Sequence, residues 1–256
     1  MSTLIEKTSN KLVKAFLKNK TIASLPRKFT KKLTEANKFR ILCESKVQRP
    51  IIGFKAGGTA IPVMKKLKEK EPFYASVYKS NFLKSGKSVK IKKTTFGIEL
   101  EVCYLVKKSF FKSKGLITLR NISKFISHMA PCIEIVGYRQ RKKGITSFGD
   151  LCSDFGANVK FLIGQKKKYK RINIGNLKTN IFNKKTKQNV NGNTGAVFIN
   201  PLNSLRFVLN KIRKDKINLD KNFYIFTGST VGVVPIGKGL YRGKIEKLGS
   251  VKAFIK

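Results

Sequence analysis

Hydrophobic residues recur at helical spacing near the start of the chain and again in two later segments. Between residues 3 and 20, apolar positions repeat every three or four residues with lysines on the other face, which predicts an amphipathic helix. A second helix is expected over about 30–46 and another over 120–129. Residues 201–214 show the clearest stripe, and they begin with a proline, which suits the first turn of a helix.

Beyond residue 50 the pattern changes to short apolar runs separated by turn residues, which is typical of strands. The predicted strands are 51–57, 73–78, 89–91, 97–106, 132–138, 159–164, 195–199, 224–229 and 244–255. The polar segments 166–171 and 183–193 are interpreted as loops or hairpin turns. The pattern therefore predicts an α+β protein, in which a small helical unit at 1–49 precedes a mainly β body with a mixed sheet at 50–256.

The charge of the chain is strongly positive, with 56 Lys+Arg against 13 Asp+Glu and a formal net charge of +43. Such a chain gains affinity for nucleic acid through the release of counterions. The cations, however, are mostly lysine and spread along the whole chain, whereas proteins that read phosphates and bases rely on arginine. The chain is also rich in Ile, Asn and Phe, which favours a genome-wide bias in amino-acid composition as the source of the lysines. Nucleic acid is therefore not expected to be the main partner.

Membrane and secretory classes are disfavoured by the same pattern. No apolar run approaches the roughly 18 residues that a membrane span needs. The N-terminus lacks a secretory signal, although its basic, amphipathic character leaves an organellar targeting peptide open. Cys43, Cys103, Cys132 and Cys152 form no CxxC pair, so we expect reduced core thiols in a cytoplasmic protein rather than disulfides or a zinc site.

Two of the few acidic residues, Glu99 and Glu101, lie one residue apart in an apolar run. On a strand they project from the same face, where two ionised carboxylates repel unless a cation separates them or one takes a proton. Glu134 lies in another apolar strand. An oxygen-only set of this kind suits a hard ion such as Mg²⁺ or Mn²⁺. The alternative is a solvent face on which the glutamates pair with lysines.

Other candidate residues carry weaker signals. Lys55 lies in an apolar strand that ends in glycines, where partial burial would lower its pKa and suit it to acid–base work; a snorkelling surface lysine is the alternative. The segment 227–230 offers hydroxyls and a close backbone to an anion, but it is equally an ordinary turn. Asp150 and Asp154, four residues apart, are interpreted as caps, lysine partners or site residues. His128 is expected to be structural or exposed.

Taken in order, these segments resemble the 2-keto-4-pentenoate hydratase / 2-oxo-3-hexenedioate decarboxylase family of the fumarylacetoacetate hydrolase superfamily. The runs GFKAGGT, GIELEVCYLV and PCIEIVGYR are similar to its lysine strand and its two metal-binding strands. EPFYASVY, the spacing of the two aspartates, VNGNTGAVFINPLNSLRFVLN, IFTGSTVGVVPIGKG and IEKLGSVKAFI follow other segments of the family. The motifs are short, but all occur in the family's order, over about residues 20–256.

The resemblance implies a β-roll-like mixed fold, a homo-oligomer and a divalent metal, Mg²⁺ or Mn²⁺. It implies a substrate that is a 2-oxo or 2-hydroxydienoic acid, such as 2-hydroxypenta-2,4-dienoate, chelated through its carboxylate and C2 oxygen. Water then adds to the double bond, or, in the decarboxylases, the distal carboxylate leaves. By this resemblance the metal ligands are Glu99, Glu101 and Glu134, the catalytic residue is Lys55, and the substrate-binding residues are Thr227, Gly228, Ser229 and Asp154.

The chain departs from the family at positions near the expected site. Gly97 stands where the family has an arginine, Phe73 where it commonly has an acid, Ala157 where it has a serine, and Leu240 where it has an aspartate. The metal ligands are retained, but groups that would orient them or transfer protons are lost. The alternative function is therefore a catalytically impaired relative that binds a metabolite or an anionic polymer through its lysine-rich surface.

Overall fold

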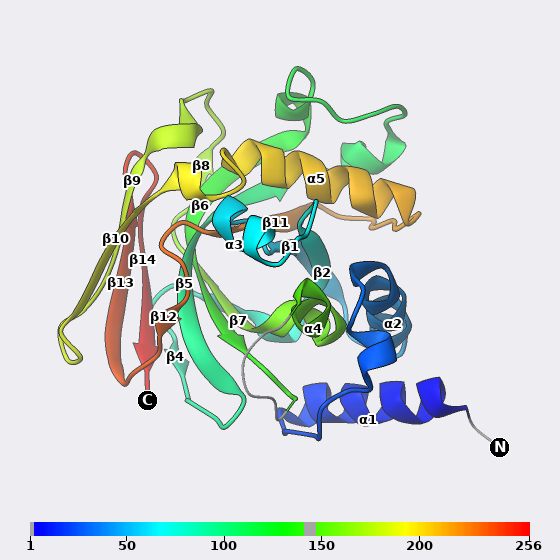
Figure 1. The fold of residues 1–256 in the computed structure, drawn as a ribbon. Coiled ribbons are helices and arrows are strands. Elements are labelled where there is room, and N and C mark those ends of the chain that lie inside the picture. The colour runs from blue at the N-terminus through cyan, green and yellow to red at the C-terminus, as the bar shows by residue number, and fades with distance from the viewer. Residues whose placement is uncertain (1–2, 141–146) are drawn as a thin grey trace.

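The computed structural model describes residues 3–140 and 147–256, which form two packed sheets and a set of helices (Figure 1). The helices are α1 Leu4–Lys18, α2 Leu33–Ser45, α3 Ile61–Lys66, α4 Phe148–Ser153 and α5 Pro201–Lys214. The strands are β1 Ile51–Gly57, β2 Phe73–Tyr78, β3 Phe82–Lys84, β4 Ser88–Val89, β5 Thr95–Val106, β6 Ile126–Gly137, β7 Asn158–Ile163, β8 Lys167–Lys168, β9 Lys178–Asn183, β10 Gln188–Asn193, β11 Phe223–Ser229, β12 Val234–Pro235, β13 Gly239–Ile245 and β14 Gly249–Ile255. This arrangement confirms the predicted α+β class.

The larger sheet has the order β2-β1-β11-β5-β6-β7-β3, with β12 paired to β5 and β8 paired to β6. Its strands are mostly antiparallel, but β1 runs parallel to β11 and β3 parallel to β7, so the sheet is mixed. The smaller sheet has the order β10-β9-β13-β14-β4 and faces one side of the larger one (Figure 1). β5 and β6 pair with each other inside the larger sheet, and most of their side chains are buried.

One continuous apolar core lies between the two sheets and beneath α5. Leu100 and Ile133 from the larger sheet meet Tyr241 and Val251 from the smaller one, and all four are fully buried. Helix α5 forms as predicted because Asn200 caps its start by accepting a hydrogen bond from the Leu202 N–H at 2.9 Å, and its apolar stripe packs into the same core. The core thus fixes the strand pair that carries the three glutamates.

The N-terminal helices pack directly on the β body. The ring of Phe16 in α1 stacks on Phe155 with centroids 4.1 Å apart and also contacts Tyr78 of β2. The predicted boundary at residue 49 marks the change from helices to strands, but the apolar contacts continue across it. None of the described helices is long and apolar enough to cross a bilayer. All four cysteines are buried and free, as expected for core thiols.

Three predicted elements were wrong. Residues 120–129 form only a short 3₁₀ turn, Ile122–Phe125, before β6 begins, because the segment pairs along β5. Residues 195–199 are not a strand: a 3₁₀ turn at Thr194–Ala196 is followed by two left-handed residues that lead the chain into α5. The apolar run at 244–255 is a hairpin, β13–β14, because the turn after Ile245 reverses the chain.

Predictions for shorter segments were partly right. The strand expected at 89–91 is limited to β4, which pairs with β14. Residues 183–193 contain the expected hairpin turn, but the chain on either side of it forms β9 and β10. The loop expected at 166–171 includes β8 on β6. His128 lies half-buried in β6 and shares a hydrogen bond with Ser127, so it is structural.

Candidate metal centre

Three glutamates meet at the centre of the larger sheet. Glu99 of β5 lies directly opposite Glu134 of β6, and Glu101 projects from the same face of β5. One carboxylate oxygen of each lies within 4.8 Å of the others. Glu101 and Glu134 are fully buried, whereas Glu99 is partly exposed. The interpretation in which these residues line a solvent face is therefore wrong.

The cluster is electrostatically unfavourable without a cation. Burial and the charge of Glu134 raise the pKa of Glu99 from 4.5 to about 7, although the Lys55 ammonium opposes the rise. Burial and the charge of Glu99 likewise raise the pKa of Glu101 to about 7. Burial raises the pKa of Glu134 well above its ordinary value despite the adjacent ammonium. Around neutral pH, the three carboxyl groups of the folded protein are therefore only partly ionised.

Two oxygens of this cluster have no hydrogen-bond partner among the described residues, Glu101 Oε1 and Glu134 Oε2. Buried polar atoms are nearly always paired, so their lone pairs point to a missing ligand. The donor set consists of carboxylates alone, which suits Mg²⁺ or Mn²⁺ and not a soft metal. The residues present thus fit a divalent cation.

Lys55 approaches the cluster from β1. Its Nζ donates to Glu134 Oε1 at 2.7 Å and to the Gly156 carbonyl at 3.1 Å, and the residue is only 4% exposed. Burial by itself lowers the pKa of Lys55, but the charges of the three glutamates outweigh it and the net pKa is raised. The predicted lowering is wrong here, and so is the snorkelling alternative. Lys55 is a buried ammonium ion that can hold or give a proton.

Gly228 completes the support of Glu101. The ladder between β11 and β5 shifts register between Phe226 and Ser229, and there the Gly228 N–H donates to Glu101 Oε2 at 3.1 Å. A side chain at this position would meet Thr59 Oγ1 at 2.1 Å, and φ is +105°, so only glycine fits. The backbone of segment 227–230 does approach an anion closely, but that anion is the Glu101 carboxylate, and contact with a substrate stays a prediction.

A cavity of about 260 Å³ opens beside Glu99 and Lys55. Among the residues that the structure describes, its polar lining is limited to these two residues, Thr59, Ser229 and glycine backbone, and the remaining wall is apolar. That wall contains Ala56, Ala60, Val63, Phe73, Phe96, Val136, Phe148, Leu151, Ala157, Ala196 and Val233. The site therefore combines a charged end with a mostly aliphatic and aromatic wall.

The four predicted substrate-binding residues divide into two groups. Gly228 and Ser229 line the cavity. Thr227 does not, because its hydroxyl donates to the Val102 carbonyl at 2.8 Å inside the sheet. Asp154 does not either: both its oxygens accept from Arg139, at 2.5 Å from Nε and 2.7 Å from the backbone N–H. The position of Asp154 supports a structural role, and its expected substrate contact is not supported.

The sequence did not point to the aromatic wall. Phe73 stands opposite Phe148 with ring centroids 5.9 Å apart, and Phe96 closes another part of the chamber. These rings come from segments far apart along the chain; Phe73 and Phe148 are buried like ordinary core residues, and Phe96 is half-buried. The signal that could have identified Phe73 was its place in a family segment that usually carries an acid.

No protein-family model matches the sequence, and no curated protein matches it. Among solved structures, 4-oxalocrotonate decarboxylase from Pseudomonas putida G7 in complex with calcium and acetate is similar, with a TM-score of 0.85 and 18% identity over 100% of this chain and 99% of that one. The same enzyme with magnesium and adipate gives a TM-score of 0.83 and 19% identity over 100% and 99%. Fumarylpyruvate hydrolase from Pseudomonas aeruginosa with Mn²⁺ and pyruvate gives 0.60 and 12% over 82% and 91%. These structures show that the chain has the same mixed fold, which is the fold that the motif resemblance implied.

Proposed function

We propose that this protein is a divalent-metal-dependent lyase of the hydratase type, acting on a small 2-oxo or 2-hydroxydienoic acid with a short apolar tail, such as 2-hydroxypenta-2,4-dienoate. The observation that carries the proposal is a cluster of three glutamates, with two buried carboxylate oxygens unpaired among the described residues, next to a mostly apolar cavity that Glu99 and Lys55 line. Solved structures with this fold contain Ca²⁺, Mg²⁺ or Mn²⁺ beside acetate, adipate or pyruvate, which supports the same pairing of metal and carboxylic acid here.

Glu99, Glu101 and Glu134 are the residues that would hold Mg²⁺ or Mn²⁺. A bound divalent cation supplies a Lewis acid that lowers the energy of the enolate derived from a 2-oxo acid. The protein itself fixes the carboxylates: Gly228 N–H positions Glu101, and Lys55 positions Glu134. This rigid support comes from strands and not from loops, which suits a site that must keep its geometry.

The other residues of the cavity orient the substrate and move a proton. Lys55 Nζ is the proton-bearing atom at the charged end, and the Gly156 carbonyl holds it in place. Ser229 lies at the rim, where its hydroxyl donates to the Gly232 carbonyl at 2.7 Å and accepts from the Val231 N–H at 3.3 Å, which leaves one lone pair for an anion or water. Phe73 and Phe148 cover one side of the cavity with apolar rings, which lowers the contact of its charged end with water on that side.

The apolar wall favours hydration over decarboxylation. A decarboxylase of this type must accommodate a second carboxylate at the far end of its substrate, and a buried carboxylate needs a cation or several donors. Lys55 is the only cation among the described residues that line the cavity, and it is paired with Glu134. A substrate with an apolar tail meets no such cost.

A catalytically impaired relative is the second candidate. The observation that favours it is the small number of proton-transfer groups, since Lys55 and Glu99 are the only titratable side chains among the described lining residues. Phe73 and Ala157 occupy wall positions where the family carries an acid and a serine. Such a protein would still bind the metal and a 2-oxo acid without turning it over.

One assay separates these candidates. We expect Mg²⁺- or Mn²⁺-dependent loss of the dienol absorbance of 2-hydroxypenta-2,4-dienoate, faster than that of an analogue with a second, distal carboxylate. Glu101→Gln should abolish the activity. Metal-dependent binding without turnover would favour the impaired relative. Faster loss of the dicarboxylic analogue would overturn the hydratase assignment.

A further inference from the structure

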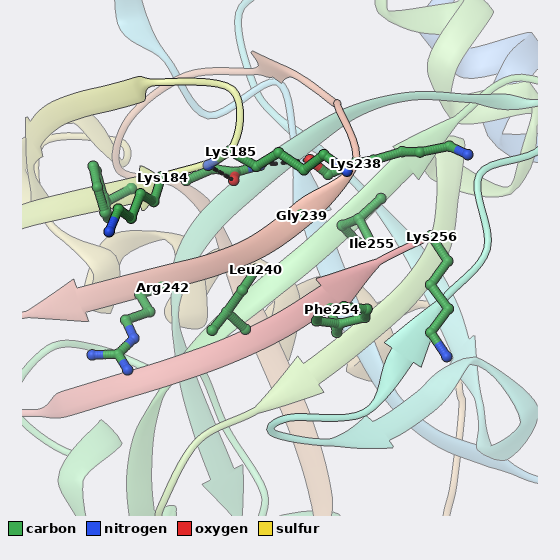
Figure 2. A pocket seen from close by; sticks show the side chains of 11 residues that line it. Lys184, Lys185, Lys238, Gly239, Leu240, Arg242, Phe254, Ile255 and Lys256 are labelled. Atoms are coloured by element: carbon green, nitrogen blue, oxygen red, sulfur yellow. Dashed lines mark hydrogen bonds between the residues drawn. The ribbon is translucent and has the colours of Figure 1, made fainter.

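The outer face of the smaller sheet carries a hollow of about 790 Å³ that shares no residue with the metal centre. Its apolar floor consists of Phe182, Leu240 and Phe254, which are 37%, 37% and 41% exposed. Leu240 of β13 lies directly opposite Phe254 of β14, and Figure 2 shows the two side chains next to each other on the sheet. Large apolar groups in this arrangement need an explanation, because this face of the sheet has no covering layer in the described part of the chain.

Five cationic side chains surround this floor: Lys184, Lys185, Lys238, Arg242 and Lys256 (Figure 2). No Asp or Glu belongs to the lining among the residues that the structure describes. We call this surface, the three apolar floor residues with the five cations, the basic sheet face. Cations gathered around a hollow without any acid create a strongly positive local field, which attracts polyanions.

The cations are held together against their mutual repulsion. Arg242 on β13 lies directly opposite Lys252 on β14, both exposed, and like charges in this cross-strand position destabilise a sheet. The buried amide of Asn183 accepts from the Lys185 backbone N–H at 3.0 Å and donates to the Lys238 carbonyl at 3.3 Å. It thereby holds two lysine-bearing loops side by side. A bound anion would remove the repulsion that the fold maintains.

We propose that the basic sheet face binds single-stranded nucleic acid without sequence preference, with bases stacking on Phe254 and Phe182 and phosphates contacting the surrounding cations. Proteins that bind single strands combine a positive groove with aromatic rings on which bases stack. Here the two kinds of group alternate on one sheet: Arg242 lies opposite Phe182 of β9, and the Lys256 ammonium lies 5.6 Å from the centroid of the Phe254 ring. This function is independent of the chemistry proposed for the cavity.

Three other occupants fit this surface less well. A second copy of the chain, related by a two-fold axis, would bring the same cations against each other. A bilayer would have to reach apolar side chains that form the floor of a hollow beneath longer Lys and Arg side chains. An acidic peptide would meet the charges, but it has no planar groups to match the two exposed rings.

The test measures fluorescence anisotropy of a labelled oligothymidylate and of an abasic oligomer of equal length, across a series of salt concentrations. The wild-type chain should bind the oligothymidylate more tightly. Phe254→Leu keeps an apolar side chain but removes the stacking surface, so it should weaken oligothymidylate binding about tenfold while leaving the abasic oligomer unchanged. Arg242→Gln/Lys252→Gln should reduce the salt slope by about 1.4, or roughly 0.7 for each phosphate contact.

A matched pair of substitutions on α1, Lys11→Gln/Lys14→Gln, removes the same charge from exposed positions away from this sheet (Figure 1). It should leave the preference for bases intact and change the salt slope much less. Equal binding of the two oligomers, or an equal loss in the α1 variant, would overturn the proposal in favour of diffuse charge. Tighter binding of phosphatidylserine vesicles or of polyglutamate would overturn it in favour of a membrane or an acidic partner.

Discussion

Among the described residues, two of the buried ion pairs, Arg139–Asp154 and Lys55–Glu134, differ in how completely their atoms are hydrogen-bonded. Arg139 and Asp154 are both nearly inaccessible, and so are Lys55 and Glu134. The Arg139 guanidinium donates to Asp154 and to the Asn158 carbonyl at 2.8 Å, so donors and acceptors match. In the second pair, Glu134 Oε2 has no partner among the described residues. The hydrogen bonds of the Arg139–Asp154 pair are therefore complete, whereas the Lys55–Glu134 pair leaves one carboxylate oxygen that requires a further partner, such as a cation.

The surroundings of the two pairs differ in the same direction. Asp154 has positive and N–H groups around both its oxygens. Glu134 faces two further carboxylates, which the strand register places beside it. Buried charges are tolerated only when they are paired and hydrogen-bonded. Burial and charge are common to both pairs. What distinguishes the candidate site is a buried carboxylate oxygen without a hydrogen-bond partner among the described residues.

The largest effect is expected from breaking the complete pair. Arg139→Met leaves the Asp154 carboxylate buried without its cation, which should cost about 3–5 kcal/mol of unfolding free energy. For a chain of this size the melting temperature should fall by about 10 °C. Urea unfolding measures the change. Lys55→Met is the matched control: Glu134, whose pKa is already raised, can take a proton, so the cost should be smaller. A larger loss for Lys55→Met would contradict the comparison.

The pH dependence of stability should expose the strained cluster. Glu99 and Glu101 have a pKa of about 7 in the folded protein against an ordinary value of 4.5, so folding takes up protons between these limits. The metal-free protein should therefore be most stable near pH 5 and lose on the order of 3 kcal/mol as pH rises to 8. Mg²⁺ should oppose this loss, because it binds the ionised carboxylates.

The control for the pH series is the double variant Glu99→Gln/Glu101→Gln. Its stability should change little over the range in which the wild-type protein weakens, since the two titrating groups are gone. Urea unfolding of both proteins at pH 5.5 and pH 8, with a chelator present, provides the measurement. Equal slopes in the two proteins would show that other groups are responsible.

A single isosteric change should have opposite effects in the two regions. Glu101→Gln removes one buried charge and keeps the oxygen that accepts from Gly228 N–H, so the metal-free protein at pH 8 should gain about 2 kcal/mol. Asp154→Asn weakens the complete pair and should lose stability. Thermal unfolding compares the two variants directly. A loss of stability in both would mean that the glutamate cluster is itself a structural network.

The smallest effect separates Thr227 from Ser229. Thr227→Val removes a buried hydrogen bond to the Val102 carbonyl and should cost about 1 kcal/mol without changing ligand affinity. Ser229→Ala, at the cavity rim, should leave stability within about 0.5 kcal/mol but weaken the binding of oxalate in the presence of Mn²⁺. Calorimetric titration with oxalate distinguishes the two. Unfolding data showing the reverse order would exchange their roles.

The central strands and the glutamate cluster could be predicted from the sequence because a strand alternates its faces strictly. The period of two places Glu99 and Glu101 on one face of β5. Ile98 and Leu100 on the other face are fully buried, and this excludes a register shifted by one residue. The clear helical stripe and the proline at its start likewise gave α5 its observed bounds. Where the local pattern is this strong, it determines the secondary structure, and tertiary contacts change it little.

The rest depended on contacts between distant segments. The four-residue spacing of Asp150 and Asp154 gives no indication that Asp154 pairs with Arg139. The apolar run at 244–255 likewise gives no sign of the turn that makes it part of a hairpin. The raised pKa of Lys55 depends on charges from β5 and β6, which the sequence of β1 does not contain. The aromatic wall combines Phe73 with rings from other elements. The homo-oligomer stays a prediction.

The most direct test of the central claim is a calorimetric titration of Mn²⁺ into the chelator-treated protein at pH 8, with and without oxalate. We expect the wild-type chain to bind one metal ion and to bind oxalate only in the presence of Mn²⁺. Glu101→Gln should lose both metal binding and oxalate binding. Glu246→Gln, which changes an exposed glutamate, should behave as wild type. Metal binding that persists unchanged in Glu101→Gln, or oxalate binding without metal, would contradict the assignment of the three glutamates as a metal centre.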